Sequence, residues 1–303
     1  MLKRLEYFIF YGNYFYGFCT VGLAIEASMQ QEVALNSPYF YIILYCSTVI
    51  FYTVAYIQEE KTSYVNRRSQ WYGENAKMIR FTQLLLLILS ILIFLNLLYT
   101  FHQNVKFISW PQIIPLIFTA AIAMAYYGFS IGKRTVSTRN TGWFKPFVIG
   151  WVWAVVVTYL PVLWHQVEAG EHYNLSQINL WYFLKNFMFI SLLAILFDIK
   201  DFAADHNQKL KTFVVRYGIL KTIYFIILPL VLIGFLCFII FALLLDFPLI
   251  VIIINSIPFI LLIIVAWSMQ RTKPIIYYLA VIDGLMLLKA ICGITAMLLI
   301  RKF

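Results

Sequence analysis

Long apolar stretches alternate with short polar segments along the whole chain. Each stretch has about 20 residues, enough to cross the hydrocarbon core of a membrane as a helix. The pattern predicts an all-α integral membrane bundle of about nine transmembrane helices in one domain, residues 1–303. The expected spans are residues 7–28, 37–57, 79–101, 111–131, 147–164, 179–197, 222–245, 248–268 and 275–300.

The composition supports the same class. Of the 303 residues, 63% are hydrophobic and 12% are charged, whereas a soluble domain carries about 25% charged residues. The net charge of +10 does not indicate nucleic-acid binding, because the basic residues concentrate in alternate loops rather than in one patch. Five segments hold 17 of the 23 Lys and Arg residues, at positions 3–4, 61–77, 133–145, 200–221 and 271–273.

This distribution of basic residues predicts the orientation of the chain. Loops rich in Lys and Arg remain on the cytoplasmic side of a multispanning protein. We therefore expect a multi-pass protein of the plasma membrane, with a cytoplasmic N-terminus and an extracytoplasmic C-terminus.

Three of the five aspartates lie within eight residues at the end of the sixth expected span: Asp198, Asp201 and Asp205. On a helix they project within roughly 60° of one another. Like charges at this spacing repel unless a divalent cation lies between them, and carboxylates together with substrate phosphates suit Mg²⁺. The alternative is an ordinary solvated helix end after a membrane span.

These residues also match a known pattern. The run Asp198-x-x-Asp201-x-x-x-Asp205, followed by Lys211-Thr212 and Arg216-Tyr217-Gly218, resembles the second aspartate-rich motif of UbiA-type membrane prenyltransferases. The segment from Tyr126 to Thr135 resembles the family's Tyr…Lys-Arg-x-Thr loop, although the proline often found after the tyrosine is missing. The resemblance implies a helical bundle around a central cavity. It also implies transfer of a prenyl group from an isoprenyl diphosphate to an aromatic or other lipophilic acceptor at the cytoplasmic membrane face.

The resemblance further implies a set of site residues. Asp198, Asp201 and Asp205 would be catalytic and would bind Mg²⁺, the expected cofactor. The diphosphate would be bound by Lys133, Arg134, Arg67, Arg68, Lys209 and Lys211. The expected partners are an isoprenyl diphosphate, a lipophilic acceptor and membrane lipids, with no nucleic acid.

The loop between the second and third spans departs from the family pattern. Its first aspartate-rich motif has no aspartate here; Glu59 and Glu60 stand in that region. Adjacent residues on a helix point about 100° apart, so at most one of these glutamates can face a metal. The alternative is that this loop only carries the positive charge that sets the topology.

Two readings without catalysis stay open at this point. The chain could be a non-catalytic family member that binds a lipid or a protein partner. It could also be a small transporter with Asp283 as its proton site, although the sequence shows no internal repeat of the kind many transporters have. Asp283 lies within the last expected span, where an ionisable group is costly and usually faces the bundle interior. A buried hydrogen bond to a neighbouring helix is the simpler explanation for it.

Overall fold

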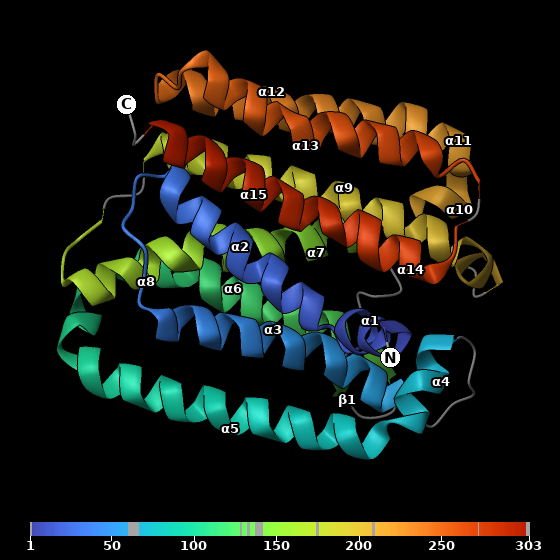
Figure 1. The fold of residues 1–303 in the computed structure, drawn as a ribbon, viewed down its shortest axis with the longest axis horizontal. Coiled ribbons are helices and arrows are strands. Elements are labelled where there is room, and N and C mark those ends of the chain that lie inside the picture. The colour runs from blue at the N-terminus through green and yellow to red at the C-terminus, as the bar shows by residue number, and fades with distance from the viewer. Residues whose placement is uncertain are drawn as a thin grey trace.

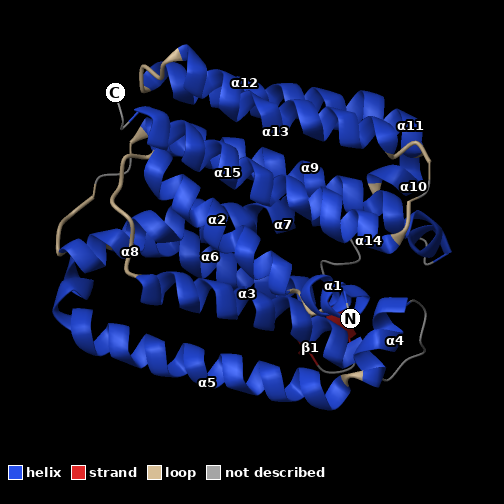
Figure 2. Ribbon diagram, viewed as in Figure 1, coloured by secondary structure: helices blue, strands red, loops and turns tan. Residues whose placement is uncertain are grey.

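The computed structural model describes residues 2–59, 67–127, 129–131, 134–136, 142–173, 176–207, 210–271 and 273–300. These residues are overwhelmingly helical (Figure 2), as the apolar pattern predicts. The one hairpin among them pairs β1 (Phe129–Ile131) with β2 (Arg134–Val136) in antiparallel fashion. The helices are α1 (Leu2–Tyr11), α2 (Tyr14–Gln30), α3 (Pro38–Glu59), α4 (Arg67–Glu74), α5 (Ala76–Phe101), η1 (His102–Phe107), α6 (Trp110–Tyr127), α7 (Lys145–Ala154), η3 (Val155–Tyr159), α8 (Leu160–Ala169), α9 (Gln177–Asn207), α10 (Phe213–Tyr217), α11 (Ile219–Thr222), η4 (Ile223–Ile227), α12 (Leu228–Leu244), α13 (Leu249–Ser268), α14 (Ile275–Tyr277), η5 (Tyr278–Ile282) and α15 (Asp283–Ile300).

The expected count of nine spans is not confirmed, although a helix forms at each expected place. In the described part of the chain, six helical segments are long and apolar enough to cross a membrane. The count becomes seven if α1 and α2 together form one bent span. The apolar parts of α3 and α6, Pro38–Val54 and Trp110–Ala125, are shorter than the other spans.

The first expected span, residues 7–28, is bent rather than straight. α1 and α2 meet at an angle of 59°, because Asn13 takes a left-handed backbone conformation with φ of 64° that cannot continue a right-handed helix. Asn13 is completely buried. Its Nδ2 donates to Thr53 Oγ1 at 3.1 Å and to Tyr72 Oη at 3.0 Å, which ties the bend to α3 and α4.

Contacts between neighbouring helices close a ring, and α3 and α5 lie beside it on one side, at the bottom of Figure 1. Around the ring, α2 packs against α15, α15 against α13, α13 against α12, α12 against α9, α9 against α7, and the η3 turn that continues α7 returns to α2. On the other side α3 packs against α2 and α5 against α3. In the most apolar 18-residue stretch of each candidate span, the share of buried residues is highest in α9, at 61%, and lowest in the span that begins with α5, at 11%. α9 is therefore a core helix, and α5 is a peripheral one.

Three wide π-helical turns interrupt the long helices, at η3, η4 and η5. Pro161 and Pro229 lie two residues after the end of the first two of these turns. A proline ring clashes with the carbonyl four residues earlier and removes a helical hydrogen bond, so a widened turn before each proline relieves that clash. The third turn, η5, has no proline after it.

A buried ionic cluster links four helices of the ring. Lys289 Nζ of α15 lies 2.8 and 2.6 Å from the two carboxylate oxygens of Glu26 on α2. Lys185 Nζ of α9 lies 2.9 Å from Gln30 Oε1 and 3.4 Å from Glu26 Oε1, while Gln30 Nε2 donates to Asn255 Oδ1 of α13 at 2.6 Å. All five of these side chains are at least 95% buried. The cluster is a fold determinant, because an isolated charge at this depth is strongly disfavoured.

The two lysines are expected to differ in their effect on stability. Lys289→Met should lower the free energy of unfolding by about 3–5 kcal/mol, because it removes the cation that contacts both Glu26 oxygens. Lys185→Met is the matched control and should cost less, about 1–3 kcal/mol, because it mainly leaves Gln30 without a donor. Chemical unfolding of the detergent-solubilised protein measures both values. Equal losses would contradict the assignment of Lys289 as the principal partner of Glu26.

Candidate functional site

The candidate site lies at the end of the bundle where α9 finishes, which we call the aspartate end. α1, α4 and α10 lie at this same end (Figure 1). It contains the last two turns of α9, the first turn of α7, residues 142–144 before α7 and residues 210–212 after α9. Most of the sequence-predicted site residues fall here.

The three aspartates of α9 are not equivalent. Asp198 is completely buried, and Asp205 is 7% exposed, whereas the side chain of Asp201 is 40% exposed. Asp198 and Asp205 are seven residues apart, close to two helical turns, so both face inward. Asp201 lies at the edge of this face, where its Oδ1 is 3.3 Å from Lys200 Nζ. The shared face that the sequence predicts therefore separates into two inward carboxylates and one half-exposed carboxylate.

The buried partner of Asp198 comes from another helix. Lys145 Nζ, in the first turn of α7, lies 2.9 Å from Asp198 Oδ1. The second oxygen, Asp198 Oδ2, is buried and accepts no hydrogen bond. Both Asp205 and Asp201 lie within electrostatic range of this carboxylate. Asp198 thus combines one neutralised oxygen with one oxygen that can accept a further ligand.

The arrangement differs from a metal centre made of three protein carboxylates. Among the described residues, no group of three or more His, Cys, Asp or Glu side chains is placed to hold a metal ion. The physical reason is that Lys145 attracts Asp198 inward while Asp201 turns to Lys200. Mg²⁺ commonly takes only one or two carboxylates and completes its shell with phosphate and water. The buried Asp198 Oδ2 fits that smaller donor set.

Arg68 is placed differently from its neighbour Arg67. Arg67 is exposed, whereas Arg68 is 4% exposed and its guanidinium lies over the Tyr56 ring, 4.0 Å from the ring centre. Arg68 donates to Tyr56 Oη at 2.8 Å, to the Tyr11 carbonyl at 3.0 Å and to Asn13 Oδ1 at 2.5 Å. Its Nε has no hydrogen-bond partner. Most of its donors are therefore already used to hold α4 against the bend between α1 and α2.

Tyr72 completes this contact between α4 and the bend. Its hydroxyl donates to the Tyr11 carbonyl at 2.8 Å, and its ring stacks on Tyr56 with the centroids 5.1 Å apart. Burial raises the pKa of Tyr72 to about 12. The phenol therefore stays neutral and remains a hydrogen-bond donor.

Two further loops meet at the aspartate end. A Cβ added to Gly142, just before α7, would lie 2.4 Å from the backbone of both Lys211 and Thr212. Only glycine permits this close approach of the two backbones. Lys211 is exposed, and Thr212 caps α10 by accepting a hydrogen bond from the Val215 amide at 3.3 Å. The contact brings the segment that follows Lys133 and Arg134 in sequence against the segment that follows the aspartates.

Several predicted residues cannot be placed. The side chains of Glu59 and Arg134, and the whole of Glu60, Lys133 and Lys209, lie outside the described residues.

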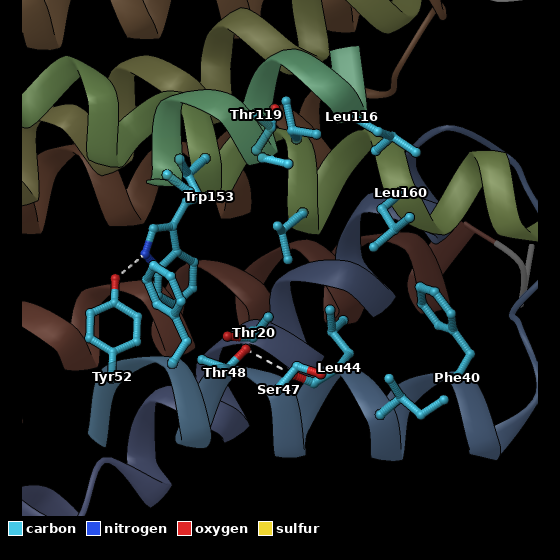
Figure 3. A pocket seen from close by; sticks show the side chains of 17 residues that line it. Thr20, Phe40, Leu44, Ser47, Thr48, Tyr52, Leu116, Thr119, Trp153 and Leu160 are labelled. Atoms are coloured by element: carbon cyan, nitrogen blue, oxygen red, sulfur yellow. Dashed lines mark hydrogen bonds between the residues drawn. The ribbon is translucent and has the colours of Figure 1, made fainter. Parts of the chain in front are cut away.

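An apolar pocket of about 390 Å³ opens between α2 and α3 on one side and α6, α7 and η3 on the other (Figure 3). Phe40, Leu44 and Thr48 of α3 face Leu116 and Thr119 of α6 across it. Its volume falls in the range of small-molecule sites, about 300–1,000 Å³. The expected central cavity is not confirmed, because this pocket lies on the α3–α6 side of the closed ring.

A hydrogen bond between two aromatic side chains closes one end of the pocket. Trp153 Nε1 of α7 donates to Tyr52 Oη of α3. The Tyr52 ring stacks on Tyr16 of α2, with their centroids 4.5 Å apart. Trp153 lies eight residues after Lys145 on the same helical stretch, about 12 Å along the axis. The aromatic end of the pocket therefore points toward the aspartate end.

Sequence reasoning missed Lys145, Asn13, Tyr16, Tyr52 and Trp153. In the sequence, Lys145 is one of the basic loop residues that predict the topology. Its sequence position gives no sign of a partner 53 residues away, and aromatic residues are too frequent in this chain, at 18%, to single out individual rings.

Comparisons with known proteins give one similar solved structure and no family assignment. No protein-family model matches the chain, and no curated protein matches its sequence. The similar structure is a digeranylgeranylglyceryl phosphate synthase studied in membranes, with a TM-score of 0.55 and 16% sequence identity. The similarity covers 98% of this chain and 99% of the synthase. The chain has the fold of a membrane prenyltransferase. This supports the resemblance to UbiA-type enzymes at the level of the fold.

The two neighbouring arginines of α4 provide a direct comparison. Arg68→Lys is expected to destabilise the protein by about 1–3 kcal/mol, because an ammonium group cannot reproduce the guanidinium fork and leaves buried acceptors unpaired. Arg67→Lys should change stability by less than about 0.5 kcal/mol, because Arg67 is exposed. Thermal unfolding in detergent distinguishes the two variants. Equal stability of both would show that the buried contacts of Arg68 do not anchor α4.

Proposed function

We propose that this protein transfers a prenyl group from an isoprenyl diphosphate to an aromatic or other lipophilic acceptor. The observation that carries the proposal is the buried Asp198–Lys145 pair, which leaves Asp198 Oδ2 without a partner. It lies at one end of a helical bundle with the fold of a membrane prenyltransferase. A carboxylate and an ammonium side by side suit a ligand that contains both a metal ion and a diphosphate.

Asp198 and Asp205 are the proposed inward ligands of Mg²⁺, with Asp201 at the edge of the site. Bound there, Mg²⁺ would neutralise the negative charge that develops on the diphosphate as its bond to the prenyl chain breaks. Lys145 keeps the Asp198 side chain in place and adds a positive charge to the same region. Glu59 or Glu60 is the proposed carboxylate on the facing loop.

The diphosphate is proposed to lie between the loops that meet at Gly142. Lys133, Arg134, Lys209 and Lys211 belong to those loops and would supply positive charge. Arg67 is exposed and would contribute from α4, whereas Arg68 would act mainly by fixing α4, with only its remaining N–H groups available. The high density of Lys and Arg at this end supports a cytoplasmic location for the site.

The apolar pocket is the proposed site of the isoprenoid chain. Its long walls of Phe, Leu, Ile, Val and Ala side chains match a hydrocarbon. Its aromatic end at Tyr52 and Trp153 lies about 12 Å along the helix axis from Lys145. A chain held by its diphosphate at the aspartate end could therefore pass these rings and enter the pocket.

Binding of a prenyl diphosphate tests the aspartate site. Asp198→Asn and Asp205→Asn are each expected to weaken the Mg²⁺-dependent binding of geranylgeranyl diphosphate roughly 10–100-fold, because each removes a charged acceptor. Asp201→Asn should have a smaller effect, because that side chain is half exposed.

Asp246→Asn is the matched control, since Asp246 is exposed in the turn between α12 and α13 and takes a φ of 51° that asparagine tolerates. Titration calorimetry in detergent measures all four variants and the wild type. Wild-type protein that neither binds the diphosphate nor transfers the chain to any acceptor would refute the proposed function.

Filling the pocket tests the site of the chain. Ala123→Phe is expected to raise the KM for geranylgeranyl diphosphate about tenfold or more while leaving geranyl diphosphate nearly unaffected, because only the longer chain needs the pocket. Ala121→Phe on the same helix is the control, since Ala121 is exposed and does not line the pocket. The measurement is steady-state transfer of labelled prenyl groups. An equal effect on both donors would place the chain elsewhere.

A further inference from the structure

The two ends of the apolar pocket are built differently (Figure 3). Tyr52 and Trp153 lie at one end, and Phe40 and Leu160 lie at the other. Phe40 is in the first turn of α3, whereas α4 packs near the last turns of that helix. Since α4 belongs to the aspartate end (Figure 1), the Phe40 end of the pocket is the one remote from the proposed diphosphate site.

A pair of aromatic rings closes this remote end. The ring of Phe40 stacks on Trp164 of α8, with the ring planes 11° apart and the centroids 6.4 Å apart. Phe40 is 6% exposed and forms a small core cluster with Ala24 and Leu44, separate from the main core of the bundle. Phe101, the last residue of α5, meets Trp164 edge-on at 6.4 Å. We call Phe40 and Trp164 together the aromatic plug.

A carboxylate of α8 holds the aromatic plug in place. Glu168 Oε1 accepts hydrogen bonds from Trp164 Nε1 at 2.8 Å and from Ser37 Oγ at 2.6 Å. Its second oxygen, Oε2, accepts a hydrogen bond from the Ser37 backbone amide at 2.7 Å. Ser37 directly precedes α3, so one side chain fixes both Trp164 and the beginning of the helix that carries Phe40. Charge-assisted hydrogen bonds of this kind are short and strong, which makes the plug a rigid wall.

The pocket-lining face of α3 divides the pocket into regular steps. Residues four positions apart line it: Phe40, Leu44, Thr48 and Tyr52. Residues at this spacing share one face of a helix, and each step rises about 6 Å along the axis. An isoprene unit adds four bonds to a chain, so standard bond lengths give it an extended length of roughly 5 Å. Each step along this face therefore corresponds to about one isoprene unit.

The helical stretch on the facing wall gives the length of the whole path. Trp164 follows Trp153 at about 16 Å along the axis, which leaves room for about three extended isoprene units inside the pocket. Lys145 precedes Trp153 by about 12 Å, a distance that takes the diphosphate and about one further unit. The path from the aspartate end to the plug therefore holds a chain of about four units.

We propose that the aromatic plug sets the longest isoprenoid chain that this protein accepts, about four isoprene units. The inference rests on the proposed function and on the pocket as the site of the chain. The last unit of such a donor reaches the ring of Phe40. A longer chain meets packed rings, and a packed interior admits extra volume only by displacing side chains at a cost in free energy. Phe40 is the wall that the chain touches, and Glu168 is a positioning residue that acts through Trp164.

Two variants of α3 test the inference in opposite directions. Phe40→Ala removes the wall, so the ratio of kcat/KM for hexaprenyl diphosphate to kcat/KM for geranylgeranyl diphosphate should rise about tenfold or more. Leu44→Phe moves the wall one step toward Tyr52. The kcat/KM for geranylgeranyl diphosphate should then fall about tenfold or more, while that for farnesyl diphosphate stays within about threefold. A purely structural role would lower the values for all donors together.

Two further variants test the positioning role and serve as a control. Glu168→Ala releases Trp164 and should raise the hexaprenyl-to-geranylgeranyl ratio less, about threefold, because Phe40 is still present. An unchanged ratio in this variant would overturn the positioning role of Glu168. Tyr39→Ala is the matched control, since Tyr39 precedes Phe40 in the same turn, is 51% exposed and does not line the pocket. It should leave the selectivity for chain length unchanged.

Steady-state transfer of each labelled prenyl group in detergent is the measurement, with calorimetry of donor binding beside it. Equal kcat/KM of the wild type for geranylgeranyl and hexaprenyl diphosphate would overturn the role of the plug and leave the proposed function intact. Unchanged chain-length selectivity in Phe40→Ala and Leu44→Phe would do the same. Wild-type protein that neither binds nor transfers any of the donors would overturn the proposed function, and this inference with it. If Phe40→Ala does not fold, Phe40→Leu opens a smaller space, and unchanged selectivity in that variant would overturn the inference.

Discussion

The close contact between α2 and α15 is the constraint on which the rest of the structure depends. Gly293 allows it, because a Cβ there would lie 2.4 Å from Glu26 Cγ. The ion pair between Glu26 and Lys289 then forms across the contact, away from lipid and water. Between helices in a membrane, close packing and polar contacts replace the hydrophobic effect as the source of association. This pair fixes the ring at the junction of the first and last core helices.

The same ring determines where polar groups can lie. The ionic cluster of Glu26, Lys185 and Lys289 holds α2, α9 and α15 together, and α9 then carries Asp198 into contact with α7. α2 also supplies Tyr16 and begins directly after Asn13, whose side chain contacts Tyr72 of α4. The aspartates of α9 and the anchored helix α4 therefore share one end of the bundle, because two helices, α2 and α9, reach it from the fixed core.

The apolar pocket and the aspartate end are complementary in chemistry. The pocket is walled almost entirely by hydrocarbon, whereas the aspartate end gathers carboxylates, lysines and hydrogen-bonding tyrosines. Tyr16, Tyr52 and Trp153 lie at the boundary between them. An amphiphilic substrate with a charged head and a long apolar chain matches this division, because each part finds its own kind of environment.

The sequence by itself determined the class of protein and the position of nearly every helix, because in lipid every backbone polar group must be satisfied within a helix or a closed barrel. Apolar length therefore predicts helices, although Asn13 bends the first span and the count of nine is not confirmed. The local spacing of Asp198, Asp201 and Asp205 singled out the end of α9, since neighbours on a helix face can be read from periodicity. Only the tertiary structure showed that Lys145 is paired with Asp198, that Arg68 is buried against Asn13, and that Lys289 is paired with Glu26. Each of these contacts joins residues far apart in the chain. Their partners are decided by how helices pack, and the spacing of residues within one helix carries no information about that packing.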